Sequence, residues 1–189
     1  MSKVAIQGAA TGTGVFTLAS PATNTNRTLT LPDEAGTVLT TASDVAQKGV
    51  PIFEVTLTTS QAISNVTDTK VAFNSVITDT HSYWDSSNYR YTPQITGWYQ
   101  FNVAVKYGSY ITDQTITYIY KNGSMYRRGG QQGEWANDPT TAFGCLVYLN
   151  GTTDYVEIYG YKSSSSGAMQ FNGGSNFLTW MNGFLVRAE

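Results

Sequence analysis

Carboxylates are the residues of this sequence that could most readily perform acid–base chemistry. Six of them lie in or near the loops expected between strands: Asp79, Asp85, Asp113, Glu134, Asp138 and Asp154. A glycosidase needs two carboxylates at a fixed separation across a sugar bond, and loop carboxylates can also bind calcium. Solvated turn residues are the commoner case, and no calcium-loop spacing occurs. We therefore predict no catalytic pair and no metal or other cofactor, and calcium binding stays open.

Two further features could carry chemistry, and both favour a structural interpretation. The single cysteine, Cys145, lies in the apolar run "AFGCLVYL", and the single histidine, His81, lies in a polar stretch. A cysteine nucleophile needs a base beside it, so we expect a packed, inert thiol. The run "GAATGTGV" contains Gly12 and Gly14, but it lacks the preceding strand and following helix of a dinucleotide site. We therefore expect no enzymatic activity.

Composition excludes several classes of partner. The chain has 189 residues, of which 41% are hydrophobic and only 13% charged, and its net charge is −2. A protein that grips phosphates carries a basic field, so we expect no nucleic-acid partner. No stretch approaches the ~20 apolar residues of a membrane span, so we expect no membrane insertion.

The composition of the sequence changes at about residue 50. All 13 tyrosines and all 4 tryptophans follow residue 82, whereas residues 1–48 contain one aromatic side chain, Phe16. A segment so poor in large apolar side chains cannot offset the entropy of ordering its own backbone. We predict an N-terminal attachment arm over residues 1–48, a linker over 49–52 and a head domain over 53–189.

The head is predicted to be all-β. Alternating or β-branched runs such as "IFEVTLT" and "GWYQFNVAVKYGSY" recur about every ten residues, and no segment has a helical apolar period. Asn122-Gly123 lies between two strand-like runs, which is the strongest short signal for a hairpin. These patterns are typical of a β-sandwich.

Several of these runs resemble the globular head of complement component one-q. The stretch "YTPQITGWYQFNVAV" resembles its signature strand, "IYKNG" its central hairpin and "SNFLTWMNGFLV" its closing strand. The residues that carry the resemblance are Pro93, Gly97, Trp98, Tyr99, Phe101, Phe177, Gly183, Phe184 and Leu185. The resemblance implies the jelly roll shared with the tumour necrosis factor superfamily, and a trimer. The sequence has no collagen stalk and no secretion signal, so we do not expect a role in animal complement.

The opening segment resembles a recurrent element in virion proteins of tailed bacteriophages. Its pattern, "TLTLPDEAGTVLTT", places Pro32, Asp33 and Gly36 in a turn between two alternating runs. The predicted virion-attachment residues are Phe16, Leu18, Leu29, Leu31, Pro32, Asp33, Gly36 and Val38. The resemblance implies an extended β-rich arm that anchors the protein to other virion proteins of the capsid or tail.

These features predict a homotrimeric structural virion protein made in the bacterial host cytoplasm. It would serve as a tail fibre or receptor-binding tip, or as a capsid decoration (cement) protein, and the arm could swap between subunits. A free-standing, lectin-like carbohydrate-binding module is the alternative. The predicted trimer-interface residues are Tyr99, Phe101, Tyr118, Tyr120 and Tyr159, which could equally fill each sandwich. The predicted contacts for a host-surface glycan are Tyr83, Trp84, Tyr126, Arg127, Arg128 and Trp135, although Trp84 and Trp135 could instead pin their loops to the sandwich.

Overall fold

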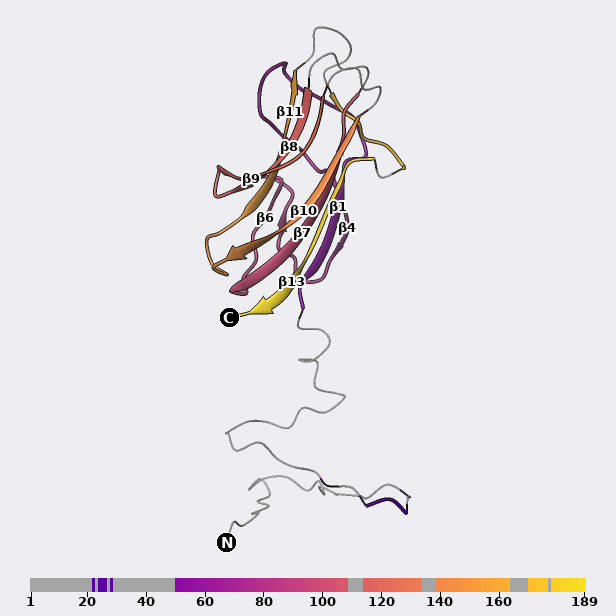
Figure 1. Cartoon of the computed structure of the whole chain (residues 1–189), viewed down its shortest axis with the longest axis vertical. Helices are drawn as coiled ribbons and strands as arrows, with labels where there is room; N and C mark the ends of the chain where they lie inside the picture. Colours follow the sequence, from indigo (N-terminus) through magenta and orange to yellow (C-terminus); the bar gives the residue numbers. More distant parts are fainter. Residues whose placement is uncertain are drawn as a thin grey trace. The chain divides into compact units, whose positions relative to one another are not determined.

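The computed structural model describes residues 22, 24–26, 28, 50–108, 114–133, 139–163, 170–176 and 178–189. The chain divides into two units, Met1–Val38 and Leu39–Glu189. The strands of the described residues belong to the second unit, in which Figure 1 shows them gathered into one sandwich. Within the described residues, no helix is long and apolar enough to span a membrane.

Thirteen strands make up the described part of the head. Their bounds are β1 Ile52–Thr56, β2 Gln61–Ala62, β3 Thr69–Lys70, β4 Ser75–Asp79, β5 Trp84–Asp85, β6 Arg90–Tyr91, β7 Gly97–Lys106, β8 Gln114–Lys121, β9 Ser124–Gln132, β10 Thr140–Leu149, β11 Val156–Ser163, β12 Gln170–Phe171 and β13 Trp180–Ala188. The long strands coincide with the alternating runs of the sequence, so the prediction of an all-β head is confirmed.

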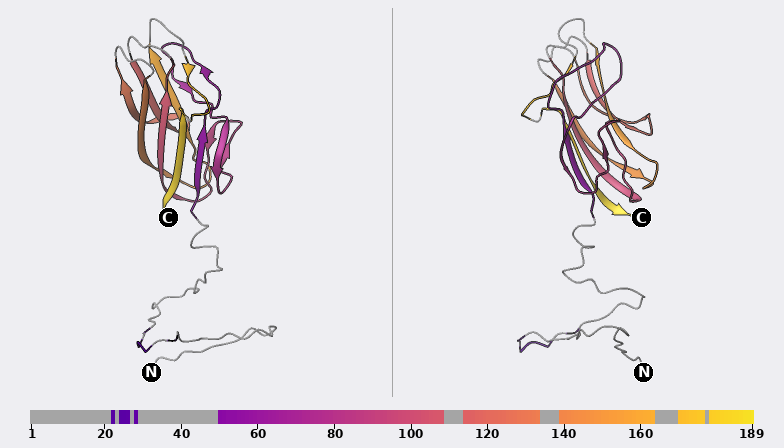
Figure 2. Two further views of the ribbon diagram at one scale, coloured as in Figure 1. Left: turned by 90° about the vertical axis from the view of Figure 1, so that its right-hand side faces the viewer. Right: turned by 180° about the vertical axis from the view of Figure 1, so that it is seen from behind.

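The strands form two main antiparallel sheets (Figures 1 and 2). The five-stranded sheet has the order β10-β7-β13-β1-β4. The six-stranded sheet has the order β5-β6-β11-β8-β9, with β3 also paired to β11, and β12 pairs with β2 in a small third sheet. Because β1 runs antiparallel to β13, the head begins and ends at the same end of the sandwich.

Alternation along the long strands builds the core. In β7, Tyr99, Phe101, Val103 and Val105 are buried, whereas Trp98 before them is exposed, and Gln100 and Asn102 between them are half-buried. Side chains two residues apart share a face of a sheet, so the buried set points between the two sheets. An aromatic cluster fills this space, in which the Phe53 and Tyr91 rings stack with centroids 4.0 Å apart.

The hairpin predicted at Asn122-Gly123 is confirmed. β8 and β9 pair on either side of it, and Asn122 and Gly123 have φ angles of 53° and 75°. Asn and Gly tolerate this left-handed backbone better than other residues do. The Asn122 side chain donates to the Asp154 carboxylate at 2.7 Å, and Lys121 Nζ lies 2.8 Å from the same carboxylate. This network joins the hairpin to the loop that precedes β11.

Candidate functional site: the outer face of the five-stranded sheet

Exposed apolar side chains concentrate on one sheet of the head. Ten large apolar side chains are exposed among the described residues, and seven of them belong to strands of the five-stranded sheet. These seven are Ile52, Val76, Ile77, Trp98, Leu146, Phe184 and Val186. Isolated exposed apolar residues are ordinary, but the register places Ile52, Trp98, Leu146 and Phe184 on one face of this sheet, and a contiguous apolar patch of this kind marks an interaction surface.

The strand register arranges the outward side chains of this sheet in rows. One row is largely apolar: Leu146 lies opposite Gln100, Gln100 opposite Phe184, and Phe184 opposite Ile52. We call this row the apolar row. Directly opposite residues on one face of a sheet are within contact distance, so the row is a continuous stripe across β10, β7, β13 and β1.

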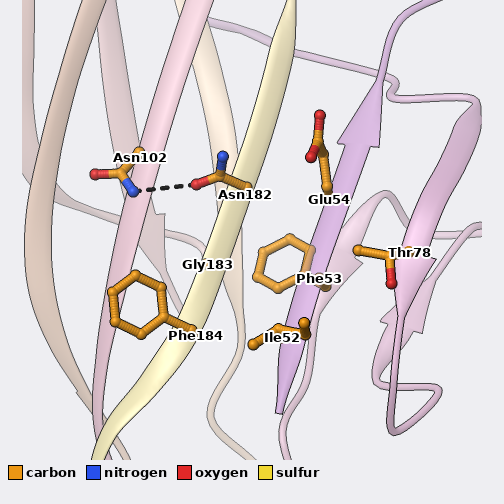
Figure 3. Close-up of a pocket in the computed structure, with 8 residues that line it drawn as sticks. All are labelled: Ile52, Phe53, Glu54, Thr78, Asn102, Asn182, Gly183 and Phe184. Carbon is orange, nitrogen blue, oxygen red and sulfur yellow. Dashed lines mark hydrogen bonds between the residues drawn. The ribbon is translucent and has the colours of Figure 1, made fainter. Parts of the chain in front are cut away.

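A second row, next to the apolar row, is polar. It consists of Gly144, Asn102, Asn182, Glu54 and Thr78, which the register places opposite one another across all five strands. We call it the polar row. Figure 3 shows four side chains of this row beside Ile52 and Phe184, namely Asn102, Asn182, Glu54 and Thr78, and these six residues belong to the lining of a shallow pocket of about 340 Å³. An apolar stripe beside a line of hydrogen-bonding groups can supply both affinity and register to a docked protein.

Amides link the two rows. The Asn102 side-chain amide donates to Asn182 Oδ1 at 3.0 Å (Figure 3), and the Gln100 amide donates to Asn102 Oδ1 at 3.1 Å. A Cβ at Gly144 would lie 2.5 Å from Asn102 Oδ1 and 2.8 Å from Gln100 Nε2. The absence of a side chain at Gly144 therefore leaves the space that the amides occupy.

The structure separates the predicted trimer-interface residues into two groups. Tyr99 and Phe101 are fully buried between the sheets, so they have no surface to offer a second chain and instead pack the core of one head. Tyr118, Tyr120 and Tyr159 come together on the six-stranded sheet, where the Tyr120 and Tyr159 rings stack at 4.0 Å. Tyr120 also donates to the Asp68 carboxylate at 2.7 Å, and burial raises the pKa of its phenol. The prediction for these three remains a prediction.

The predicted glycan contacts do not form one site. Trp84 begins β5 and Tyr83 precedes it, whereas Tyr126, Arg127 and Arg128 lie within β9, and β5 and β9 are opposite edges of the six-stranded sheet. Trp84 packs against Phe53 and Phe73 at ring distances of 6.2 and 6.1 Å, as expected if it pins its loop to the sandwich. Burial raises the pKa of the Tyr83 phenol.

On β9, Arg127 lies over the Tyr126 ring at 4.7 Å, and Arg128 contacts Gln131. Trp135 lies outside the described residues.

The described carboxylates among the candidate acids stabilise turns. Asp79 accepts the backbone N–H of Trp84 at 2.8 Å. Asp85 accepts the side-chain amide of Asn88 at 2.7 Å, and this bond lowers the pKa of its carboxyl. For Asp154, desolvation raises the pKa, but hydrogen bonds from Lys121 and Asn122 outweigh it and lower the pKa overall. Asp113, Glu134 and Asp138 lie outside the described residues.

The other residues considered for chemistry are the single cysteine and possible metal ligands. Cys145 points inward from β10, and burial raises the pKa of its thiol, with an opposing effect from Arg127. In the part of the chain that the structure describes, no three acidic, histidine or cysteine side chains are grouped to hold a metal ion. The predicted attachment residues lie outside the described residues: Phe16, Leu18, Leu29, Leu31, Pro32, Asp33, Gly36 and Val38.

The residues of the outer face were not identified from the sequence. In "GWYQFNV", Tyr99 and Phe101 were predicted to form the interface. Trp98, Gln100 and Asn102 alternate with them and therefore lie on the opposite face of the strand. The more apolar face of an alternating strand is normally buried. The polar residues Gln100 and Asn102 were therefore the feature of the sequence that could have identified the outer face of β7.

Comparison with solved structures identifies the fold. The globular domain of zebrafish complement 1qA protein matches with a TM-score of 0.55 and 14% identity, over 74% of this chain and 98% of that chain. Murine APRIL at pH 8.0 matches with a TM-score of 0.56 and 10% identity, over 72% of this chain and 99% of that chain. No protein-family model and no curated protein sequence matches this chain. The head therefore has the jelly-roll fold of the complement one-q and tumour necrosis factor type, as predicted from the sequence.

Proposed function

We propose that this chain is a homotrimeric structural protein of a bacteriophage virion. The arm over residues 1–48 attaches it to other virion proteins, and the head packs against two further copies through the outer face of the five-stranded sheet. Its work is assembly and not catalysis.

The observation that carries the proposal is the uncovered apolar row. Phe184 and Ile52 remain 42% and 44% exposed although they lie opposite each other on central strands of the sheet. Apolar surface gains about 25 cal/mol for each Å² removed from water. A second copy that covers this face would therefore be held by the same effect that packs the core.

The dimensions of the face suit a stable contact. Five strands about 4.8 Å apart and up to about 30 Å long make a face of roughly 600 Å² in projection. Standard protein interfaces bury about 800 Å² of accessible surface on each partner, so this face and its rim provide the area that such an interface needs.

Two further observations support the trimer and its orientation. The complement one-q and tumour necrosis factor families, which the sequence resembles, pack three jelly rolls around one axis.

Residue 51 joins the head at the end where β13 finishes. The segment before β1 therefore connects at this end, and the ends of β7, β9 and β11 at the opposite end are free to project.

The virion assignment rests on the resemblance of the opening segment to phage virion proteins. Within it, the chain serves as a tail-fibre or receptor-binding tip, or as a capsid decoration protein. A host-surface glycan, if one is bound, would meet Tyr83 on one edge of the six-stranded sheet or the β9 residues on the other. The alternative function is a free-standing lectin-like module.

Sedimentation equilibrium of the full chain tests the assembly. The proposal predicts a mass three times the 20.6 kDa of one chain at micromolar concentration. A monomer throughout that range would overturn it. Glycan-array binding by the same sample separates a decoration protein, which would bind no sugar, from a receptor-binding tip or a lectin-like module, and the presence of the chain on purified particles separates the last two.

A further inference from the structure

Two charged side chains of the described head have no partner among the described residues. The side chains of Glu54 on β1 and Arg187 on β13 have no hydrogen bond, ion pair or ring contact in the described residues. The other ionised groups there are satisfied, for example in the ion pairs Lys70–Glu157 at 2.6 Å and Lys121–Asp154 at 2.8 Å. The two unpaired charges have opposite signs, and both belong to strands of the same five-stranded sheet.

Their positions prevent them from pairing within one chain. Glu54 lies opposite Asn182, whereas Arg187, five residues further along β13, lies opposite Trp98. Five residues of strand span about 17 Å, which exceeds the combined reach of the two side chains. Phe184 also lies between them along β13.

Covering the outer face would leave the Glu54 carboxylate in need of a donor. It forms part of the lining of the shallow pocket with Asn182, Thr78, Ile52 and Phe184 (Figure 3). A carboxylate that is removed from water without a counter-charge is strongly destabilising. A guanidinium can satisfy both oxygens of the carboxylate with two parallel hydrogen bonds.

We propose that, in the assembled protein, Arg187 of one copy enters this pocket of the next copy and pairs with Glu54. This inference rests on the proposed self-association through the outer face, and it identifies the contact that fixes how the copies are aligned. Because each copy carries the cation and the anion at different places, one copy can give Arg187 to a neighbour and accept Arg187 from another. A ring of three copies then closes with three equivalent pairs and leaves neither charge unpaired.

Charge reversal tests this pair in the full chain. The association of wild type, Glu54→Arg, Arg187→Glu and the double variant is measured by sedimentation at a series of concentrations. We expect each single reversal to weaken association at least about a hundredfold, as for buried interface charges. The double variant should recover to within about tenfold of wild type, because the pair is restored with its signs exchanged.

Matched controls separate this contact from folding and from general charge effects. Arg90→Glu changes a cation on β6 of the other sheet, and we expect it to leave association unchanged. Glu54→Gln and Arg187→Gln provide milder losses, and circular dichroism reports whether each chain is folded.

A trimer that the single reversals do not weaken would overturn the pair while leaving the proposed function intact. A double variant as weak as the single ones would do the same. A monomeric wild type would overturn both proposals.

Discussion

Replacing Phe184 tests how much the outer face contributes to association. The side chain is 42% exposed in one head. An aromatic side chain has about 200 Å² of surface, so assembly would cover about 80 Å² of it. At about 25 cal/mol per Å² this contributes about 2 kcal/mol for each chain. Phe184→Ser should therefore weaken each subunit contact about thirtyfold.

The assay is sedimentation equilibrium of the full chain, with Met125→Ser as the matched control. Met125 is 56% exposed on β9, outside the five-stranded sheet. Its replacement should leave association unchanged. The buried remainder of the Phe184 side chain, about 120 Å², contributes up to about 3 kcal/mol to the stability of the single head at the same coefficient, so circular dichroism must show that the variant is folded before its association is compared. Equal effects of the two substitutions, or none from Phe184→Ser in a trimeric protein, would refute the assignment of this face.

Three further predictions concern the amides, the hairpin and the arm. Gly144→Val should displace the Asn102 amide and weaken association without unfolding the head, which sedimentation and circular dichroism would measure together. Asp154→Asn should destabilise the head by about 2 kcal/mol at pH 7, because the carboxylate loses its ion pair with Lys121. The pKa of Asp154 is lower in the folded head, so its stabilisation is present above about pH 4 and disappears as the pH falls through the folded pKa. Urea unfolding of both proteins at pH 7 and pH 2.5 measures this, and an unchanged difference would contradict it. Removing residues 1–48 should leave a folded head that no longer joins particles; full occupancy by the truncated chain would assign attachment to the head.

The fold was predictable because local patterns determine it. Alternation along β7 and the Asn122-Gly123 turn locate strands and a hairpin without any knowledge of their neighbours. The structure confirms both features.

The candidate site was less predictable because it depends on which strands lie side by side. Glu54, Asn102 and Asn182 are far apart in the sequence and form a row only through the order β7-β13-β1. Alternation places Tyr99 and Asn102 on opposite faces, but it does not say which of the two faces meets a second chain. The order of the six-stranded sheet also separates Trp84 from Arg127, although both lie in polar, aromatic stretches of the sequence.

High-resolution cryo-electron microscopy of purified particles tests the central claim most directly. The proposal predicts three copies of the head around one axis on the capsid or the tail, with Phe184 covered and Arg187 of each copy beside Glu54 of the next. Particles without the protein, or heads that leave the outer face of the five-stranded sheet in solvent, would contradict it.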